Sequence, residues 1–241
     1  MEIFCLDTVD STNTWVAQNE KELPSPALVR GIAQNKGRGQ RGNSWEAEPG
    51  KNFTGSVLFH PLNFPASSQF LLSEAIALAI IRTLSSHGIE AKIKWPNDIY
   101  VGDSKICGIL TEHVVTGRNI TRTISGIGLN VNQEKFLSDA PNPTSMKIIT
   151  GADYNLDEIS VQIADNIEKN LSEIWRPEEL HDKFMTTLWR NDGEFHPFFD
   201  KIKNEHINAR IQSVASDGLL TIITDKGEKR DFAFKEIEFI L

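Results

Sequence analysis

The chain has 241 residues, of which 39% are hydrophobic, and this is enough for a sizeable core. It carries 25 Lys and Arg against 33 Asp and Glu, for a formal net charge of -8, which disfavours a broad nucleic-acid-binding face because such faces need clustered cations. The start lacks a signal-like segment, and the longest purely apolar run, residues 75–81, is too short to span a bilayer. Composition therefore predicts a cytoplasmic globular protein that binds neither nucleic acid nor membrane.

The first predicted elements are a strand over residues 2–9 and a helix reaching about Glu20. Ser11, Thr12 and Asn13 lie at the junction between them. Side chains of these types cap helix starts, so capping is one interpretation. Hydrogen bonding to a small polar ligand is the other.

A second predicted strand, residues 28–34, leads into a loop in which glycines alternate with cations. These residues are Gly37, Gly39 and Gly42, interleaved with Lys36, Arg38 and Arg41. Glycine lets backbone N–H groups approach an anion closely, and arginine presents a planar fork of donors to phosphate or carboxylate. The loop is either an anion-binding loop or a solvated basic turn.

The same glycines formally match the dinucleotide-binding fingerprint. That fingerprint requires a helix to begin at the motif, whereas turn-forming residues such as Asn43, Pro49 and Gly50 follow here. A kinase loop is excluded as well, because the chain contains no His-Arg-Asp or Asp-Phe-Gly triplet.

Residues 52–59 are predicted to form a strand, and Ser67 or Ser68 to cap a long apolar helix that ends near residue 86. Residues 91–101 are predicted as two short strands broken at Pro96, which holds Asn97 and Asp98 in a defined turn. A structural Asx turn and a binding site explain this turn equally well.

Lys105 opens an apolar strand, where an ammonium group is costly unless it reaches water or meets an anion. The following hairpin ends in a strand that carries Gly126 and Gly128, and glycine inside a strand often marks the close approach of a ligand. A polar loop is predicted from Gln133 to about residue 153.

Isoleucine and leucine at helical spacing predict an amphipathic helix over residues 159–174, followed by a shorter helix from Pro177. Short strands over residues 206–214, 219–224 and 231–241, separated by turns, then predict a small β-barrel. We expect a main domain over residues 1–195 and a second one over 196–241. Two cysteines, Cys5 and Cys107, lack any C-x-x-C pairing and are interpreted as buried, inert thiols.

Taken together, these motifs resemble biotin protein ligases in order and spacing from Asp10 to Asn132. The motifs are Asp10-Ser11-Thr12-Asn13, Gln34 with the loop 37–42, Lys94-Trp95-Pro96-Asn97-Asp98, Lys105 with Gly108-Ile109-Leu110, and Gly126-Ile127-Gly128-Leu129-Asn130-Val131-Asn132. The resemblance implies an α+β fold: a mixed central sheet flanked by helices, as in class II synthetase-like biotin/lipoate ligase catalytic domains, with a C-terminal SH3-like β-barrel. Ligases of this family adenylate biotin with ATP and Mg²⁺, and then pass it to a lysine of a biotin carboxyl carrier domain.

The resemblance also implies a role for each matched position. Biotin and its adenylate would contact Ser11, Thr12, Asn13, Gln34, Arg38, Gly39, Gln40, Lys105 and Gly108. The nucleotide would contact Trp45, Asn97, Gly128 and Asn130, with Asp98 on the same side. The resemblance identifies no metal ligands.

The chemistry asks for similar groups independently of the family. A carboxylate that attacks the α-phosphorus of ATP brings two anions together, and cations must stabilise the charge that accumulates. Arg38 and Lys105 are the candidates. Asp98 is a candidate catalytic group that would accept a proton from the acceptor lysine, with Mg²⁺ binding or a structural role as alternatives.

Two positions depart from the fullest form of the loop motif, since many relatives have arginine where Gln40 and Asn43 stand. Glutamine donates hydrogen bonds without attracting phosphate by charge, so we expect a working enzyme with a weakened grip on the adenylate. A Gln40→Arg variant that released no less free adenylate than the wild type would contradict this.

Three further expectations follow from the resemblance. The motif begins at Asp10, so we expect no DNA-binding domain before it. The chain is either a monomer or a homodimer. The alternatives to a biotin ligase are a lipoate ligase or octanoyltransferase, whose motifs differ over residues 37–42 and 94–98, and a non-catalytic binding module.

Overall fold

A computed structural model describes residues 1–39, 43–137 and 142–240 and places most of them around one large mixed sheet. Its strands run in the order β1 (Glu2–Val9), β2 (Ala27–Gln34), β3 (Phe53–Phe59), β8 (Asn119–Leu129), β7 (Ser104–Thr116), β6 (Asp98–Val101) and β5 (Lys92–Lys94), and β4 (Phe64–Pro65) pairs with β8. The β1 and β2 strands are parallel, and all other neighbours are antiparallel.

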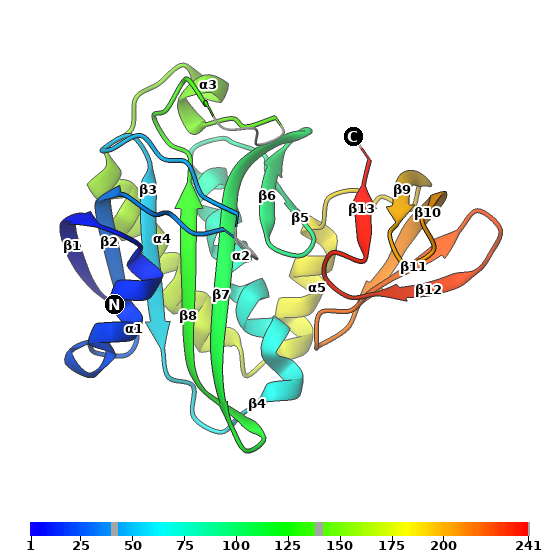
Figure 1. Cartoon of the computed structure of the whole chain (residues 1–241), viewed down its shortest axis with the longest axis horizontal. Coiled ribbons are helices and arrows are strands. Elements are labelled where there is room, and N and C mark those ends of the chain that lie inside the picture. The colour runs from blue at the N-terminus through cyan, green and yellow to red at the C-terminus, as the bar shows by residue number, and fades with distance from the viewer. Residues whose placement is uncertain (40–42, 138–141, 241) are drawn as a thin grey trace.

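Helices cover both faces of this sheet. On one face, α2 (Gln69–Ser86) packs against α4 (Leu156–Glu173) and α5 (Pro177–Thr187), which lie behind the strands in Figure 1. On the other face, the short α1 (Thr12–Asn19) contacts β2, β3 and β8. Ile159, Ile163 and Ile167 of α4 are fully buried, which confirms the predicted amphipathic pattern.

A second, antiparallel sheet follows α5 and lies beside it in Figure 1. Its order is β12 (Lys229–Phe232), β11 (Leu220–Thr224), β10 (Glu205–Val214), β9 (His196–Asp200) and β13 (Ile237–Phe239). Within the described residues β12 and β13 are the two edge strands and the sheet does not close, and this small antiparallel sheet is consistent with the SH3-like module that the sequence predicted. A turn at Phe234 and Lys235 divides the final strand predicted by the sequence into β12 and β13, which lie at opposite edges of the sheet.

The two sheets share one hydrophobic core. The buried cluster runs from the large sheet and α2 through Trp189 to Phe198 and Phe239 of the second sheet. Trp95 Nε1 also donates a 3.0 Å hydrogen bond to the carbonyl of Gly218. The segment that leads into the Asn97–Asp98 turn is therefore fixed by both sheets.

Among the described residues, five short elements were not predicted, namely β4, β9, α3 (Met146–Thr150) and two 3-10 helices, η1 (Glu20–Glu22) and η3 (Ala66–Ser68). The α3 helix lies inside the predicted polar loop, and its five residues are too few to show a helical repeat. The β9 strand contains Pro197, which is unfavourable in strands and is tolerated in this short one.

Two interpretations are tested by burial. Cys107 is buried as predicted, and burial raises the pKa of its thiol, whereas Cys5 is exposed because β1 is an edge strand. By length and composition alone, the helical stretch 66–86 could cross a membrane. It is 67% buried inside the fold, as is typical of a core helix.

Candidate active site

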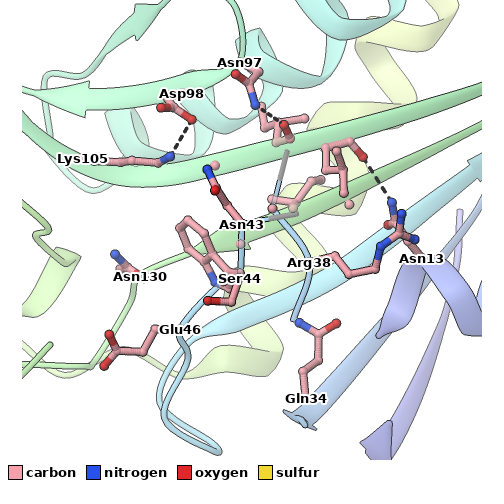
Figure 2. Close-up of a pocket in the computed structure, with 18 of the residues that line it drawn as sticks. Asn13, Gln34, Arg38, Asn43, Ser44, Glu46, Asn97, Asp98, Lys105 and Asn130 are labelled. Atoms are coloured by element: carbon pink, nitrogen blue, oxygen red, sulfur yellow. Dashed lines mark hydrogen bonds and ion pairs between the residues drawn. The ribbon is translucent and has the colours of Figure 1, made fainter. Parts of the chain in front are cut away.

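One cavity of about 840 Å³ lies where α1, the loop after β2 and strands β6, β7 and β8 meet. Of the site residues predicted from the sequence, those that line it are Ser11, Thr12, Asn13, Gln34, Arg38, Gly39, Trp45, Asn97, Asp98, Lys105, Gly108, Gly128 and Asn130. Gln40 lies outside the described residues. Figure 2 shows Asp98 and Lys105 at one end of the cavity and Asn13 and Arg38 at the other.

The start of α1 forms a polar wall of the cavity. Ser11 is at the N-cap position, but its side chain makes no capping hydrogen bond, so capping does not account for this residue. Thr12 donates from its backbone N (2.8 Å) and its Oγ1 (3.2 Å) to the Gln34 side-chain oxygen. The predicted cluster is therefore held against the end of β2.

Asn13 is 4% exposed and fully engaged by its neighbours. Its Nδ2 donates to the carbonyl of Leu110 (3.3 Å) and to Glu112 Oε2 (2.8 Å), while its Oδ1 accepts from Ser56 Oγ (2.5 Å). Gly126 makes this packing possible, because a Cβ there would lie 2.4 Å from Asn13 Oδ1. The amide is thus rigidly placed on the sheet surface.

Arg38 forms a two-pronged ion pair with Glu112, a residue that the sequence did not single out. The Arg38 Nη2 to Glu112 Oε1 distance is 2.9 Å, and Nη1 approaches Oε2 at 3.5 Å. Because Glu112 also accepts from Asn13, one carboxylate orients both the loop arginine and the helix amide.

The described ends of the glycine-rich loop, residues 37–39 and 43–45, pair with each other. Gly39 N donates to the Asn43 carbonyl (2.7 Å) and Trp45 N to the Gly37 carbonyl (2.9 Å). A Cβ on Gly37 would meet the Trp45 backbone oxygen at 2.5 Å, so glycine is needed there.

The Trp45 indole lies directly on two glycines that face each other across β7 and β8. A Cβ would come within 2.3 Å of the indole at Gly128 and within 2.9 Å at Gly108. These two glycines therefore provide a flat floor on which a ring lies.

Two buried polar atoms in this half of the cavity have no hydrogen-bond partner among the described residues, the Trp45 Nε1 donor and the Asn130 Oδ1 acceptor. Asn130 is held by Nδ2, which donates to the Thr144 carbonyl (2.9 Å). Unpaired buried polar groups are costly, and a polar planar ligand would satisfy them.

Lys105 and Asp98 form an ion pair across β6 and β7, with 2.7 Å between Nζ and Oδ1. Their side chains are 24% and 25% exposed, so the pair faces the cavity without being sealed from water. The neighbouring Asn97 donates through Nδ2 to the Ile109 carbonyl, which ties the turn to β7. The Asn97–Asp98 turn is thus both a structural turn and part of the cavity wall.

Lys94 also lines the cavity and lies among aromatic rings. Its Nζ donates to Tyr100 Oη (3.0 Å) and lies 4.5 Å from the Tyr100 ring centroid and 5.5 Å from that of Trp189. Burial lowers the pKa of Lys94 and raises the pKa of Tyr100. The rings stabilise a cation at this end of the site.

The charge of the cavity differs in sign from that of the chain. Its described lining has four cationic side chains, Arg38, Lys94, Lys105 and Lys235, and two carboxylates, Glu46 and Asp98. A local excess of positive charge in a protein of net charge -8 favours an anionic ligand. The arrangement can hold a polar head group near Ser11, a planar ring near Trp45 and an anion near Lys105.

Sequence reasoning missed Ser56, Glu112 and Lys235. Ser56 and Glu112 act through side-chain contacts with α1 and the loop, and only the strand register reveals these contacts. Lys235 comes from the second sheet, about 130 residues after Lys105, and no motif marks it.

Comparison with known proteins shows which family the sequence resembles. A sequence model of the Biotin/lipoate A/B protein ligase family matches residues 5–130. The chain is 34% identical over 130 residues to the bifunctional ligase/repressor BirA of Bacillus spizizenii, covering 53% of this chain and 40% of that protein. It is 35% identical over 129 residues to the biotin--[acetyl-CoA-carboxylase] ligase of Paracoccus denitrificans, covering 52% and 53%. The chain thus spans less than half the length of the Bacillus relative.

The fold agrees over the whole chain. The biotin protein ligase of Aquifex aeolicus in complex with biotin and ATP superposes with a TM-score of 0.80 at 23% identity, over 99% of this chain and 98% of that one. The segment matched by the family model includes the start of α1, the glycine-rich loop and the Lys105–Asp98 pair. On this evidence the chain belongs to the Biotin/lipoate A/B protein ligase family.

Proposed function

We propose that this chain is an ATP-dependent biotin protein ligase. It would activate biotin as biotinyl-5'-AMP, release pyrophosphate, and transfer biotin to a lysine of a biotin carboxyl carrier domain. The observation that carries this proposal is that one cavity joins the polar α1 start, the Trp45 ring on its glycine floor, and the cations Arg38 and Lys105. Relatives named as biotin ligases match the segment that builds it.

The biotin end of the site is assigned to the α1 start. The hydroxyl of Ser11 and the amide nitrogen of Gln34 make no hydrogen bond to a described residue, so both are open to a ligand. The ureido ring of biotin presents donors and an acceptor that such groups recognise. Thr12 and Asn13, whose polar atoms are engaged with Ser56, shape the wall behind them.

In the first half-reaction, an oxygen of the biotin carboxylate attacks the α-phosphorus of ATP. A bond forms between this oxygen and the α-phosphorus, the bond from the α-phosphorus to the oxygen that bridges it to the β-phosphorus breaks, and pyrophosphate leaves. Lys105 and Arg38 stabilise the charge that accumulates on the α-phosphate oxygens. Each cation is held by a carboxylate of this chain, Asp98 or Glu112, which positions it before the substrate arrives.

In the second half-reaction, the acceptor lysine must lose a proton before its nitrogen attacks the acyl carbon of the mixed anhydride. The amide bond forms, the bond from the acyl carbon to the phosphate oxygen breaks, and AMP leaves. The phosphate competes with Asp98 for Lys105, which releases the Asp98 carboxylate to face the incoming amine. We therefore assign Asp98 as the acceptor's proton-binding or orienting partner. If an Asp98→Ala variant transferred biotin from preformed adenylate at the wild-type rate, this assignment would be wrong.

Magnesium is expected to accompany ATP. The described residues contain no cluster of three or more His, Cys, Asp or Glu side chains suited to a metal. Mg²⁺ commonly binds through one or two carboxylates together with substrate phosphates and water, and Asp98 and Glu46 supply carboxylates to this cavity. When bound, the ion would offset the charge of the phosphates.

The decisive experiment is biotin-dependent exchange of labelled pyrophosphate into ATP. We expect exchange in the wild type and a loss of about 100-fold or more in Lys105→Ala, which removes a cation from the reacting phosphate. Lys92→Ala is the matched control, because Lys92 is an exposed lysine of β5 that does not line the cavity. Exchange with lipoate but not biotin would indicate the sister activity, and binding without exchange a non-catalytic module.

A further inference from the structure

Lys235 reaches the cavity from the second sheet. It is exposed and lies in the turn between β12 and β13. It lines the same cavity as Lys105, Asp98 and Lys94, although these come from the large sheet. The second sheet therefore contributes a cation to a site otherwise built by the first.

The turn that carries Lys235 is anchored. Glu236 N donates to the Ala233 carbonyl (3.1 Å), and Ala233 N donates back to the Glu236 carboxylate (2.7 Å). Phe234 packs against Trp95 and Phe70, with ring centroids 5.3 Å and 6.1 Å apart. Lys235 is thus fixed relative to the segment that leads into the Asn97–Asp98 turn.

The backbone of Lys235 is in the left-handed region, with φ +72°. Glycine is the residue that adopts this conformation without steric cost. A lysine at such a position keeps a long cationic side chain at the rim of the cavity at the expense of local stability.

The other described cations of the cavity already have partners. Arg38 pairs with Glu112, Lys105 pairs with Asp98, and Lys94 lies among aromatic rings. The Lys235 side chain makes no hydrogen bond or ion pair with any described residue. Its charge is therefore fully available to a ligand.

We propose that Lys235 binds the β- and γ-phosphates of ATP, and hence the pyrophosphate that leaves. This inference rests on the proposed adenylation activity. Arg38 and Lys105 are assigned to the α-phosphate and the carboxylate, so the more highly charged leaving group needs a cation of its own. The free ammonium of Lys235 supplies it, and a charge-assisted contact of this kind lowers the energy of the departing anion.

Lys235→Gly is the informative variant, because it removes the charge and also removes the steric cost of the left-handed backbone at this position. We expect an unfolding free energy equal to or above that of the wild type. The KM values for ATP and for pyrophosphate should rise about tenfold, as for the loss of one charged contact, while the KM for biotin stays unchanged. Transfer from preformed biotinyl-5'-AMP to the carrier should also be unchanged. Lys235→Arg should retain most of the affinity, and Lys226→Ala, in another turn of the same sheet, is the control.

Two results would overturn the inference. One is a folded Lys235→Gly variant whose KM values for ATP and pyrophosphate match the wild type. The other is a higher KM for the carrier alone, which would place Lys235 on an acidic surface of the carrier instead. If the wild type showed no biotin-dependent exchange, the proposed function would fail, and calorimetric titration of both proteins with Mg²⁺ and ATP would still decide the role of Lys235.

Discussion

Replacement of Gly126 by alanine tests whether the α1 start forms the biotin end of the cavity. The new Cβ would lie 2.4 Å from Asn13 Oδ1 and 3.0 Å from Asn13 Cγ, where ordinary contacts are 3.4 Å or more. The amide must therefore withdraw by about 1 Å, because carbon and oxygen atoms repel steeply at shorter distances. Such a shift lengthens the bond from Ser56 Oγ beyond hydrogen-bonding distance.

The magnitude follows from this lost bond. A buried polar group left without its partner costs about 1–3 kcal/mol, so we expect the free energy of unfolding to fall by about 2 kcal/mol. If the displaced Asn13 amide costs the biotin complex a similar amount of binding free energy, the affinity for biotin falls about 30-fold. Asn13 cannot relax into solvent, because it is 4% exposed and also bound to Leu110 and Glu112.

Calorimetric titration with biotin, and separately with ATP, is the assay. Gly128→Ala is the matched control, since its Cβ would meet the Trp45 indole at 2.3 Å and leave Asn13 undisturbed. We expect Gly126→Ala to weaken biotin binding and Gly128→Ala to weaken ATP binding. A folded Gly126→Ala protein that bound biotin within twofold of the wild type would refute the assignment of the α1 start to biotin.

Two further outcomes are expected. Glu112→Gln should slow pyrophosphate exchange about two- to fivefold, because it removes the ion pair that orients Arg38. Glu90→Gln, at an exposed site, is the control and should leave the rate unchanged. A Glu112→Gln variant that exchanged at the wild-type rate would show that Arg38 needs no carboxylate. The buried Glu74 accepts a 2.8 Å hydrogen bond from His181 and so raises the pKa of that histidine, while burial raises the pKa of Glu74. The pair of protonated His181 with Glu74 contributes fully to the free energy of unfolding below about pH 6.5, the ordinary pKa of histidine. This contribution is lost as the pH rises through the higher pKa of His181 in the folded protein, so the free energy of unfolding should fall by up to about 1 kcal/mol over this range. Denaturant titrations from pH 6 to 8.5 measure this change in the free energy of unfolding. If the His181→Gln variant showed the same dependence on pH, other groups would be responsible for it.

Much of the fold could be predicted because its elements have strong local patterns. Buried isoleucines at helical spacing define α4, and turn residues separate the strands around Asn97 and Gly218. The last strand was mispredicted because lysine at position 235 gives no sign of a turn, although its backbone adopts a conformation typical of glycine. The division into units 1–195 and 196–241 stays a prediction.

The parts of the candidate site that could be predicted are those whose residues lie together in short sequence motifs. The glycines around Arg38 and the lysine near the start of β7 indicated an anion site, and Arg38, Gly39 and Lys105 line the cavity. The partners that orient them were out of reach, since Glu112 is 74 residues from Arg38 and meets it only through the sheet. A serine or glutamate in a strand, such as Ser56 or Glu112, gives no sign in the sequence of whether its side chain faces solvent or a binding loop.

The hydrogen bond from Trp95 to Gly218 makes the second sheet part of the scaffold of the first. A protein cut after residue 195 would expose Trp95, Phe70 and Trp189, which now pack toward Phe234 and Phe239. Apolar surface of this kind favours aggregation. Loss of the C-terminal strands would therefore lower solubility, and it would also remove Lys235 from the cavity.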